Sequence, residues 1–183
     1  MQPIPQDHAL RRLFAGLVEN TFYSELGICD PEVVDYVAGL LVDFVHVDRL
    51  YALRDLKGRR LDQVAAMLSH LADESVAHTD DHDCTVHRHI GDYALFWSGV
   101  YPENLRAIQR RQYRDHLLDY ISQGKRSYAI ASELADEEAV PPSSLFRRLS
   151  DHFEFCVHGL GIVRRGWETG DPLTCKRTTD LLY

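Results

Sequence analysis

The chain has 183 residues, of which 45% are hydrophobic and 26% are charged, as in a typical folded globular protein. This length fits one domain, so we expect residues 1–183 to form a single domain. The formal net charge of −8 argues against nucleic acid as a partner, because nonspecific binding to it depends on Lys and Arg side chains that neutralise phosphates.

The N-terminal residues and the cysteines favour a cytoplasmic protein. Residues 1–7 lack the basic and apolar regions of a signal peptide, and no apolar run approaches the ~20 residues of a membrane span. Cys29, Cys84, Cys156 and Cys175 are widely separated and form no CxxC pair, so we expect reduced thiols. We therefore predict a cytoplasmic location and no membrane partner.

The first 51 residues carry two amphipathic patterns. Apolar side chains recur at helical spacing over residues 7–24, and Gly27 ends that pattern. Asp30 and Pro31 provide a helix cap followed by a proline suited to the first helical position. We expect the second and stronger pattern to continue from there as one helix to Tyr51.

A turn and a change of composition follow. Lys57–Gly58 is typical of a turn, and residues 61–72 predict a third, shorter amphipathic helix. Residues 78–83 combine three aspartates with two histidines and are poor helix-forming sequence. We expect them to form a solvated acidic loop.

Apolar patterns after residue 85 predict further helices. Apolar spacing over residues 86–101 is broad enough for a helix buried on most sides. Another helix is expected from Glu103 or Asn104 to Ile121, with Gly124 as a break before residues 128–134.

The last predicted helix starts after a proline-containing loop. Ser143 or Ser144 is suited to cap it, and a continuous apolar face extends to Leu160. We expect an irregular C-terminal tail over about residues 167–183. No strand pattern or internal repeat is visible, so the sequence predicts an all-α, compact single-domain bundle of about six or seven helices.

Histidines are concentrated in one part of the sequence, since five of the ten lie between His70 and His89. Imidazole and carboxylate groups bind zinc and iron, and histidine also titrates near neutral pH. In helical bundles such sites are built from inward-facing side chains of several helices. His46 on the second helix, with His89 and Asp92 three residues apart on a later one, are therefore candidate metal ligands or acid–base groups.

Glu154 and His158 are further candidates on the last helix. With Arg147 and Asp151 they form a charged stripe that is usually a solvated, salt-linked face, but if they faced inward they could join His46 or His89. No Glu-x-x-His pair exists in the chain, which argues against a ferritin-like di-iron centre. Arg88 and Asp92 are also spaced for an ordinary ion pair on one helix.

One segment supports a resemblance. Residues 88–103, with the pattern RHIGDxxLFWxGxxPE, and the stretch Gly124–Tyr128 resemble a group of uncharacterised bacterial helical proteins of similar length. The resemblance implies a soluble bacterial protein and transfers no catalytic residue.

Three functional hypotheses follow from these patterns. The first is a metal-dependent or acid–base enzyme acting on a small molecule, with iron or zinc as the metal and His46, His89, Asp92, Glu154 and His158 as ligands. The second is a noncatalytic protein-interaction or regulatory module, or a homodimer, in which the histidines only finish helix ends. The third depends on the Arg147–His152 and Arg111–His116 spacings, which resemble the motif of HEPN-type ribonucleases.

Overall fold

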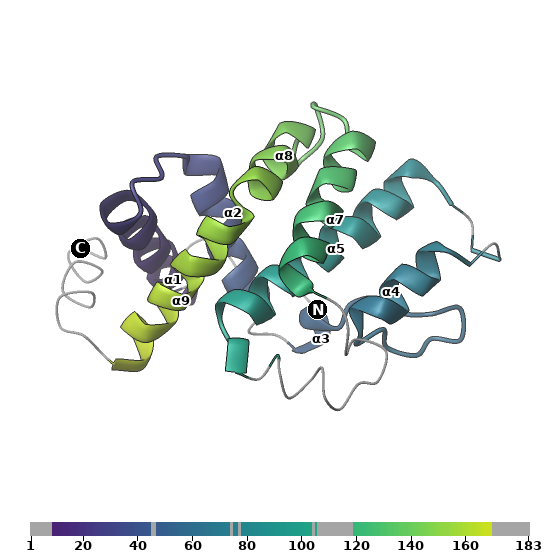
Figure 1. The fold of residues 1–183 in the computed structure, drawn as a ribbon, viewed down its shortest axis with the longest axis horizontal. Coiled ribbons are helices and arrows are strands. Elements are labelled where there is room, and N and C mark those ends of the chain that lie inside the picture. The colour runs from purple at the N-terminus through teal and green to yellow at the C-terminus, as the bar shows by residue number, and fades with distance from the viewer. Residues whose placement is uncertain are drawn as a thin grey trace.

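The structure is a computed structural model that describes residues 9–44, 47–73, 75–76, 78–103, 105 and 119–169. Within these ranges the chain is helical and contains no β-strand (Figure 1). The all-α class predicted from the sequence is therefore confirmed. The elements are α1 (Ala9–Glu19), the π-helix η1 (Asn20–Glu25), α2 (Pro31–Phe44), α3 (Val47–Leu50), α4 (Val64–Leu71), α5 (Asp80–Gly99), α7 (Tyr120–Leu134), α8 (Ser143–Asp151) and α9 (Phe153–Thr169).

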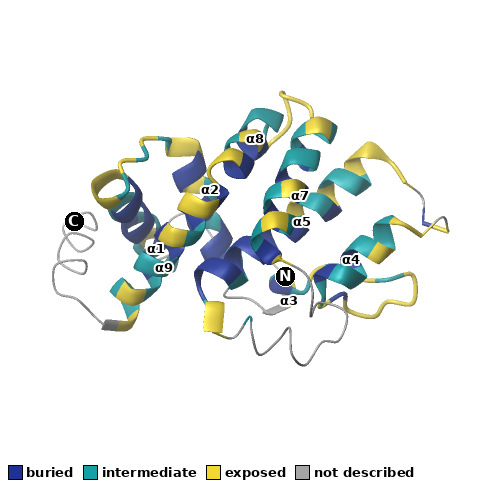
Figure 2. Cartoon of the chain, in the orientation of Figure 1, coloured by how far each residue is buried: buried dark blue, intermediate teal, exposed yellow. Residues whose placement is uncertain are grey.

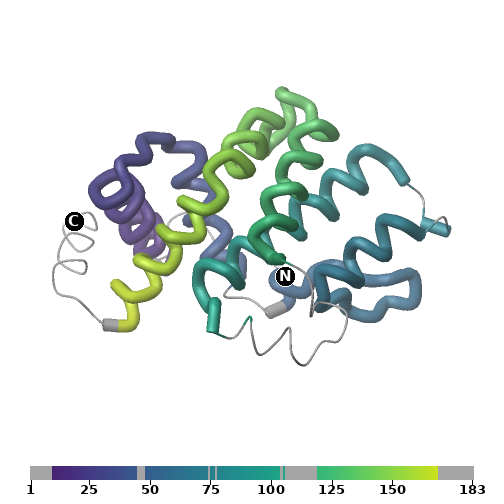
Figure 3. The backbone as a smooth tube through the Cα atoms, in the orientation of Figure 1, coloured from purple at the N-terminus to yellow at the C-terminus, as the bar shows by residue number. Residues whose placement is uncertain are grey.

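Helix α5 lies at the centre of the bundle. α7 packs along it, α8 packs against α7, and α9 and α4 also contact α5. α1 pairs with α2, and α1 lies at the opposite end of the molecule from α4 (Figures 1 and 3). The inward-facing side chains form one apolar core, in which Ile90, Tyr93 and Leu95 of α5 are almost fully buried (Figure 2).

Local signals explain the ends of the first helices. Gly27 has a φ of +69°, a conformation that glycine adopts without strain, and it follows η1 as predicted. The Asp30 carboxylate accepts a hydrogen bond of 3.2 Å from the Val33 backbone N–H, so it caps α2 as predicted. The pattern predicted as one helix to Tyr51 is divided into α2 and α3. Residues 45–46, and therefore the candidate ligand His46, lie outside the described residues.

The predicted acidic loop at residues 78–83 is wrong, because α5 begins at Asp80. The Thr79 hydroxyl accepts a hydrogen bond of 3.2 Å from the His82 backbone N–H and caps the helix. Asp80, Asp81 and Asp83 then occupy the first turn, where negative charge is favoured by the helix dipole. Aspartates that weaken a helix interior stabilise a helix start.

Glycines mark close helix contacts where we expected a break. α7 continues through Gly124, and a Cβ atom there would lie 2.4 Å from Cζ of Phe153 and 2.8 Å from Cβ of Ala94. A Cβ at Gly91 would lie 2.6 Å from the Tyr128 ring. The absence of a side chain at these positions allows α5, α7 and α9 to approach closely.

Helix α8 is capped from outside its own sequence. Its first residue is Ser143. The prediction that the Ser143 or Ser144 side chain caps this helix is wrong. Instead the Glu137 carboxylate accepts hydrogen bonds from both serine hydroxyls and from the Ser144 backbone N–H. These donors hold the pKa of Glu137 at about 2, below its ordinary value. The sequence predicted one helix from here to Leu160, but the structure divides it at His152 into α8 and α9.

Some of the sequence predictions fall on residues that the structure does not describe. The predicted helix from Glu103 or Asn104 to Ile121 lies largely outside them, and so does Cys175. α9 extends to Thr169, two residues past the start of the predicted tail. The other three cysteines form no disulfide. No helix in the described ranges combines the length and the apolar content that a membrane crossing requires.

Candidate functional site

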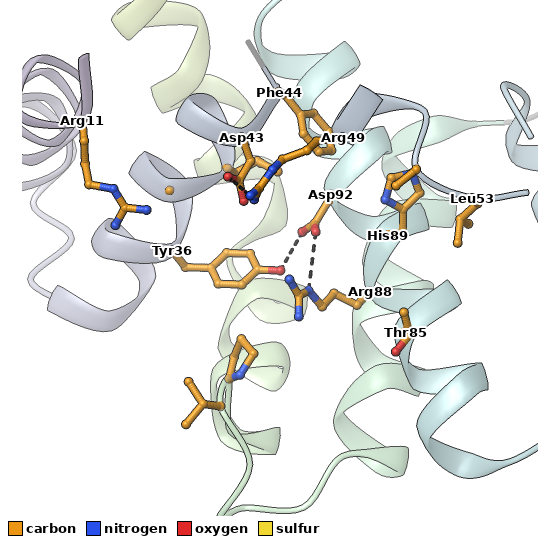
Figure 4. A pocket seen from close by; sticks show the side chains of 15 residues that line it. Arg11, Tyr36, Asp43, Phe44, Arg49, Leu53, Thr85, Arg88, His89 and Asp92 are labelled. Carbon is orange, nitrogen blue, oxygen red and sulfur yellow. Dashed lines mark hydrogen bonds and ion pairs between the residues drawn. The ribbon is translucent and has the colours of Figure 1, made fainter. Parts of the chain in front are cut away.

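A cavity of about 640 Å³ lies between α2 and α5 (Figure 4). Its volume is within the range of small-molecule sites. Apolar side chains, including Leu40, Phe44 and Leu53, form part of the wall. The titratable side chains that line it are Arg11, Tyr36, Asp43, Arg49, Arg88, His89 and Asp92.

Asp92 is the most constrained of these groups. Its carboxylate is buried, and Oδ1 accepts hydrogen bonds of 2.7 Å from the hydroxyls of both Tyr36 and Tyr128. Nε of Arg88, one helical turn earlier, lies 3.8 Å from Oδ2, which agrees with the ion pair that the spacing predicted. Burial raises the pKa of Asp92, although Arg88 and the two phenols oppose that effect.

The two tyrosines act as neutral donors to this carboxylate. Burial first, and then the negative charge of Asp92, raise the pKa of Tyr36 and of Tyr128 well above the ordinary value. Tyr36 comes from α2 and Tyr128 from α7, so Asp92 joins three helices. The ring of Tyr128 lies against Gly91, and this contact places its hydroxyl beside the next residue of α5.

His89 lines the same cavity and is a neutral imidazole near pH 7. Burial lowers its pKa below the ordinary value of 6.5, while the negative charge of Asp92 and a hydrogen bond to the Leu50 backbone partly oppose that shift. The ring lies between two aromatic side chains, with centroid distances of 6.1 Å to Phe44 and 6.3 Å to Tyr93. Its Nε2 atom is buried and has no hydrogen-bond partner among the residues that the structure describes.

Three arginines approach the cavity from three helices. Arg49 of α3 donates to the Asp43 carboxylate at 2.5 Å. Arg88 of α5 is 44% exposed and reaches the cavity beside Asp92. Arg11 of α1 also lines the cavity, and Figure 4 shows it on the other side of Tyr36 from Arg88. Its Nε atom is buried and has no hydrogen-bond partner within the described ranges.

The structure brings two of the predicted site residues, His89 and Asp92, to this cavity. Glu154 and His158 do not line it. Both are exposed on α9, and Glu154 forms an ion pair of 2.9 Å with Lys125. In the part of the chain that is described, no three His, Cys, Asp or Glu residues are placed to hold a metal ion. The predicted iron or zinc site therefore depends on His46 and stays a prediction.

Other predicted residues lie elsewhere on the surface. His78 contacts Asp83 at 3.1 Å, and the rings of His70 and His82 lie 5.6 Å apart, outside the α2–α5 cavity. Arg147 and His152, one of the two ribonuclease-like pairs, are both exposed. The other pair, Arg111 and His116, lies outside the described residues.

Sequence reasoning did not find Tyr36, Tyr128 or Arg11. Each contributes from a helix other than α5, and no spacing along the chain relates these residues to Asp92. The one available signal was the pairing rule for buried carboxylates, which requires donors for Asp92 but does not identify them.

Comparison with known proteins gives no match: no protein family model, no curated protein and no solved structure is significantly similar to the chain.

Proposed function

We propose that the chain is an enzyme that acts on a small molecule by acid–base chemistry in the α2–α5 cavity, with His89 as the general base. The observation that carries the proposal is the His89 ring, which lines a cavity of small-molecule size and has a buried Nε2 with no hydrogen-bond partner in the described part of the chain. Buried polar atoms in folded proteins are nearly always hydrogen-bonded, so an orphaned one calls for an explanation.

The hydrogen bonds of the ring identify Nε2 as the basic atom. The interaction with the Leu50 backbone raises the pKa of His89, which favours a ring that donates to Leu50, and Nε2 has no hydrogen-bond partner among the described residues, so we assign the proton of the neutral ring to Nδ1. Nε2 of the neutral ring then carries the lone pair. A substrate proton is the partner that this atom lacks.

Asp92 has a supporting role in this mechanism. When His89 takes a proton, the imidazolium is stabilised by the negative carboxylate one turn away. Tyr36, Tyr128 and Arg88 fix that carboxylate, so it does not need to reorient during the reaction. We therefore assign Asp92 as a positioning residue.

The proposal is tested with a mixture of candidate substrates. Purified protein is incubated with an extract of bacterial small metabolites, and mass spectrometry follows which compounds are consumed. We expect His89→Gln to slow that consumption by about 100-fold or more, since general bases typically contribute at least this factor. His158→Gln is the matched control, because His158 is exposed and lies outside the cavity.

Two results contradict the proposal. One is that no compound is consumed by the folded wild-type protein, which would favour a noncatalytic module. The other is equal consumption by wild type and His89→Gln. Circular dichroism of each variant shows that a lost activity is not a lost fold.

A further inference from the structure

The charged lining of the α2–α5 cavity differs in sign from the chain as a whole. Among the described residues, three arginines line the cavity together with two aspartates, whereas the full sequence has a formal net charge of −8. A positive cavity in an acidic protein favours an anionic ligand, since charge at a low-dielectric wall is weakly screened.

The three arginines differ in how far their charge is already neutralised. Arg49 is held by Asp43 at 2.5 Å. Nε of Arg88 lies 3.8 Å from Asp92, which is an ion-pair distance but too long for a hydrogen bond. Among the described residues, Arg11 forms no ion pair, and none of them supplies an acceptor for its buried Nε. Of the three arginines, Arg11 is therefore the one whose charge is least neutralised by the described residues, and an acceptor from a ligand would satisfy it.

On the basis of the proposed function, we infer that the molecule bound in this cavity is an organic oxyanion, a carboxylate or a phosphate ester, held by Arg11 and Arg88. The planar guanidinium fork matches both groups with paired N–H donors. Figure 4 shows the two side chains entering from opposite sides, with Tyr36 drawn between them. Leu40, Phe44 and Leu53 give the rest of the ligand an apolar wall.

Matched probes test the inference directly. Phenylacetate, phenyl phosphate and the neutral phenylacetamide share an apolar ring, and calorimetric titration measures the affinity of each for the full chain. We expect at least one anion to bind about 10-fold or more tightly than the amide. Hydrogen bonds to charged groups contribute more free energy than neutral ones, and the difference corresponds to about this factor in affinity. The tighter of the two anions identifies the head group. Added salt should weaken anion binding.

Variants on one helix provide the control. Arg11→Gln should weaken binding of the preferred anion by about 10-fold or more. Arg12→Gln should leave it unchanged, because Arg12 is an exposed neighbour on α1 that does not line the cavity. Equal affinity for anion and amide, absence of anion binding, or full binding by Arg11→Gln would each overturn the inference.

The outcomes separate this inference from the proposed function. If the protein binds an anion through Arg11 but consumes no metabolite, the inference of an anion-binding site is supported and the proposed enzymatic function is rejected. Consumption of a neutral compound that requires His89 but not Arg11 would keep the enzyme and reject the anionic substrate.

Discussion

The hydroxyl of Tyr128 on α7 donates a hydrogen bond of 2.7 Å to Oδ1 of Asp92 on α5. Both side chains are buried, and the bond joins the two helices that pack most extensively against each other. A charged acceptor that loses a buried donor retains the cost of its desolvation. This bond is therefore expected to contribute both to stability and to the geometry of the cavity.

Replacing Tyr128 by Phe should destabilise the protein by about 1.5–3 kcal/mol at pH 7, since the bond is to a carboxylate. Urea unfolding of the single variants and of Tyr128→Phe combined with Asp92→Asn measures the coupling. We expect the cost of Tyr128→Phe to be smaller in the Asp92→Asn background, where the acceptor is neutral. Equal costs in both backgrounds would mean that the hydroxyl does not act through Asp92.

The lowered pKa of His89 makes stability depend on pH. Below the unfolded value of about 6.5 the unfolded chain binds a proton at this position more readily than the folded chain, so the fold loses stability as pH falls through that value. His89→Gln removes this contribution. Urea unfolding at pH 7.5 and pH 5.5 should therefore show a smaller loss for His89→Gln than for wild type.

His158→Gln is the control for that comparison, because it removes an exposed histidine on α9. It should show the same loss between the two pH values as wild type. An identical pH dependence of wild type and His89→Gln would contradict the assignment of a neutral, half-buried imidazole at His89.

Gly124→Ala should destabilise the fold, because its Cβ would lie 2.4 Å from the Phe153 ring and 2.8 Å from Cβ of Ala94. Overpacking of this kind typically costs about 1–3 kcal/mol. The matched control is Gly39→Ala in the interior of α2, where nothing lies within 4 Å of the added atom. There, helix propensity favours alanine by about 1 kcal/mol. Opposite changes in the urea midpoint would support the packing explanation, and equal changes would reject it.

We expect removal of metal ions by EDTA to leave the melting temperature unchanged. The described residues provide no group of three metal ligands, and of the predicted ligands that are described, His89 and Asp92 alone reach the cavity. Metal analysis of untagged protein completes the test. Near-stoichiometric iron or zinc that is lost in His46→Ala and His89→Ala would contradict this expectation and support the predicted metal site.

Periodic patterns in the sequence predicted much of the fold because they report on one helix at a time. The apolar stripe after Asp30 predicted α2, and the i,i+3 spacing of His89 and Asp92 placed both on one side of α5, where they share a cavity. The role of Gly124 could not be predicted, because a glycine suits both a helix end and a close contact. Only the position of Phe153 decides between them.

The same limit applies to the site. Asp92 needs donors, but Tyr36 and Tyr128 are two of nine tyrosines, and no local rule selects them. Glu154 and His158 share a helical spacing that predicts a common face, but spacing alone does not say whether that face is inward. Residues on different helices become neighbours when the helices pack together. The pattern within one helix does not identify which residues of another helix it will contact.

The glycine contacts of α5 and α7 also restrict how related chains can diverge. Gly91 faces the Tyr128 ring, and Gly124 faces the Phe153 ring, each too closely for a Cβ atom. A larger residue at Gly91 becomes tolerable only when the Tyr128 ring is replaced by a smaller side chain, whereas one at Gly124 needs room from both Phe153 and Ala94. Homologous sequences should therefore change position 91 together with position 128, and a loss of the ring at 128 would also remove a hydroxyl from Asp92.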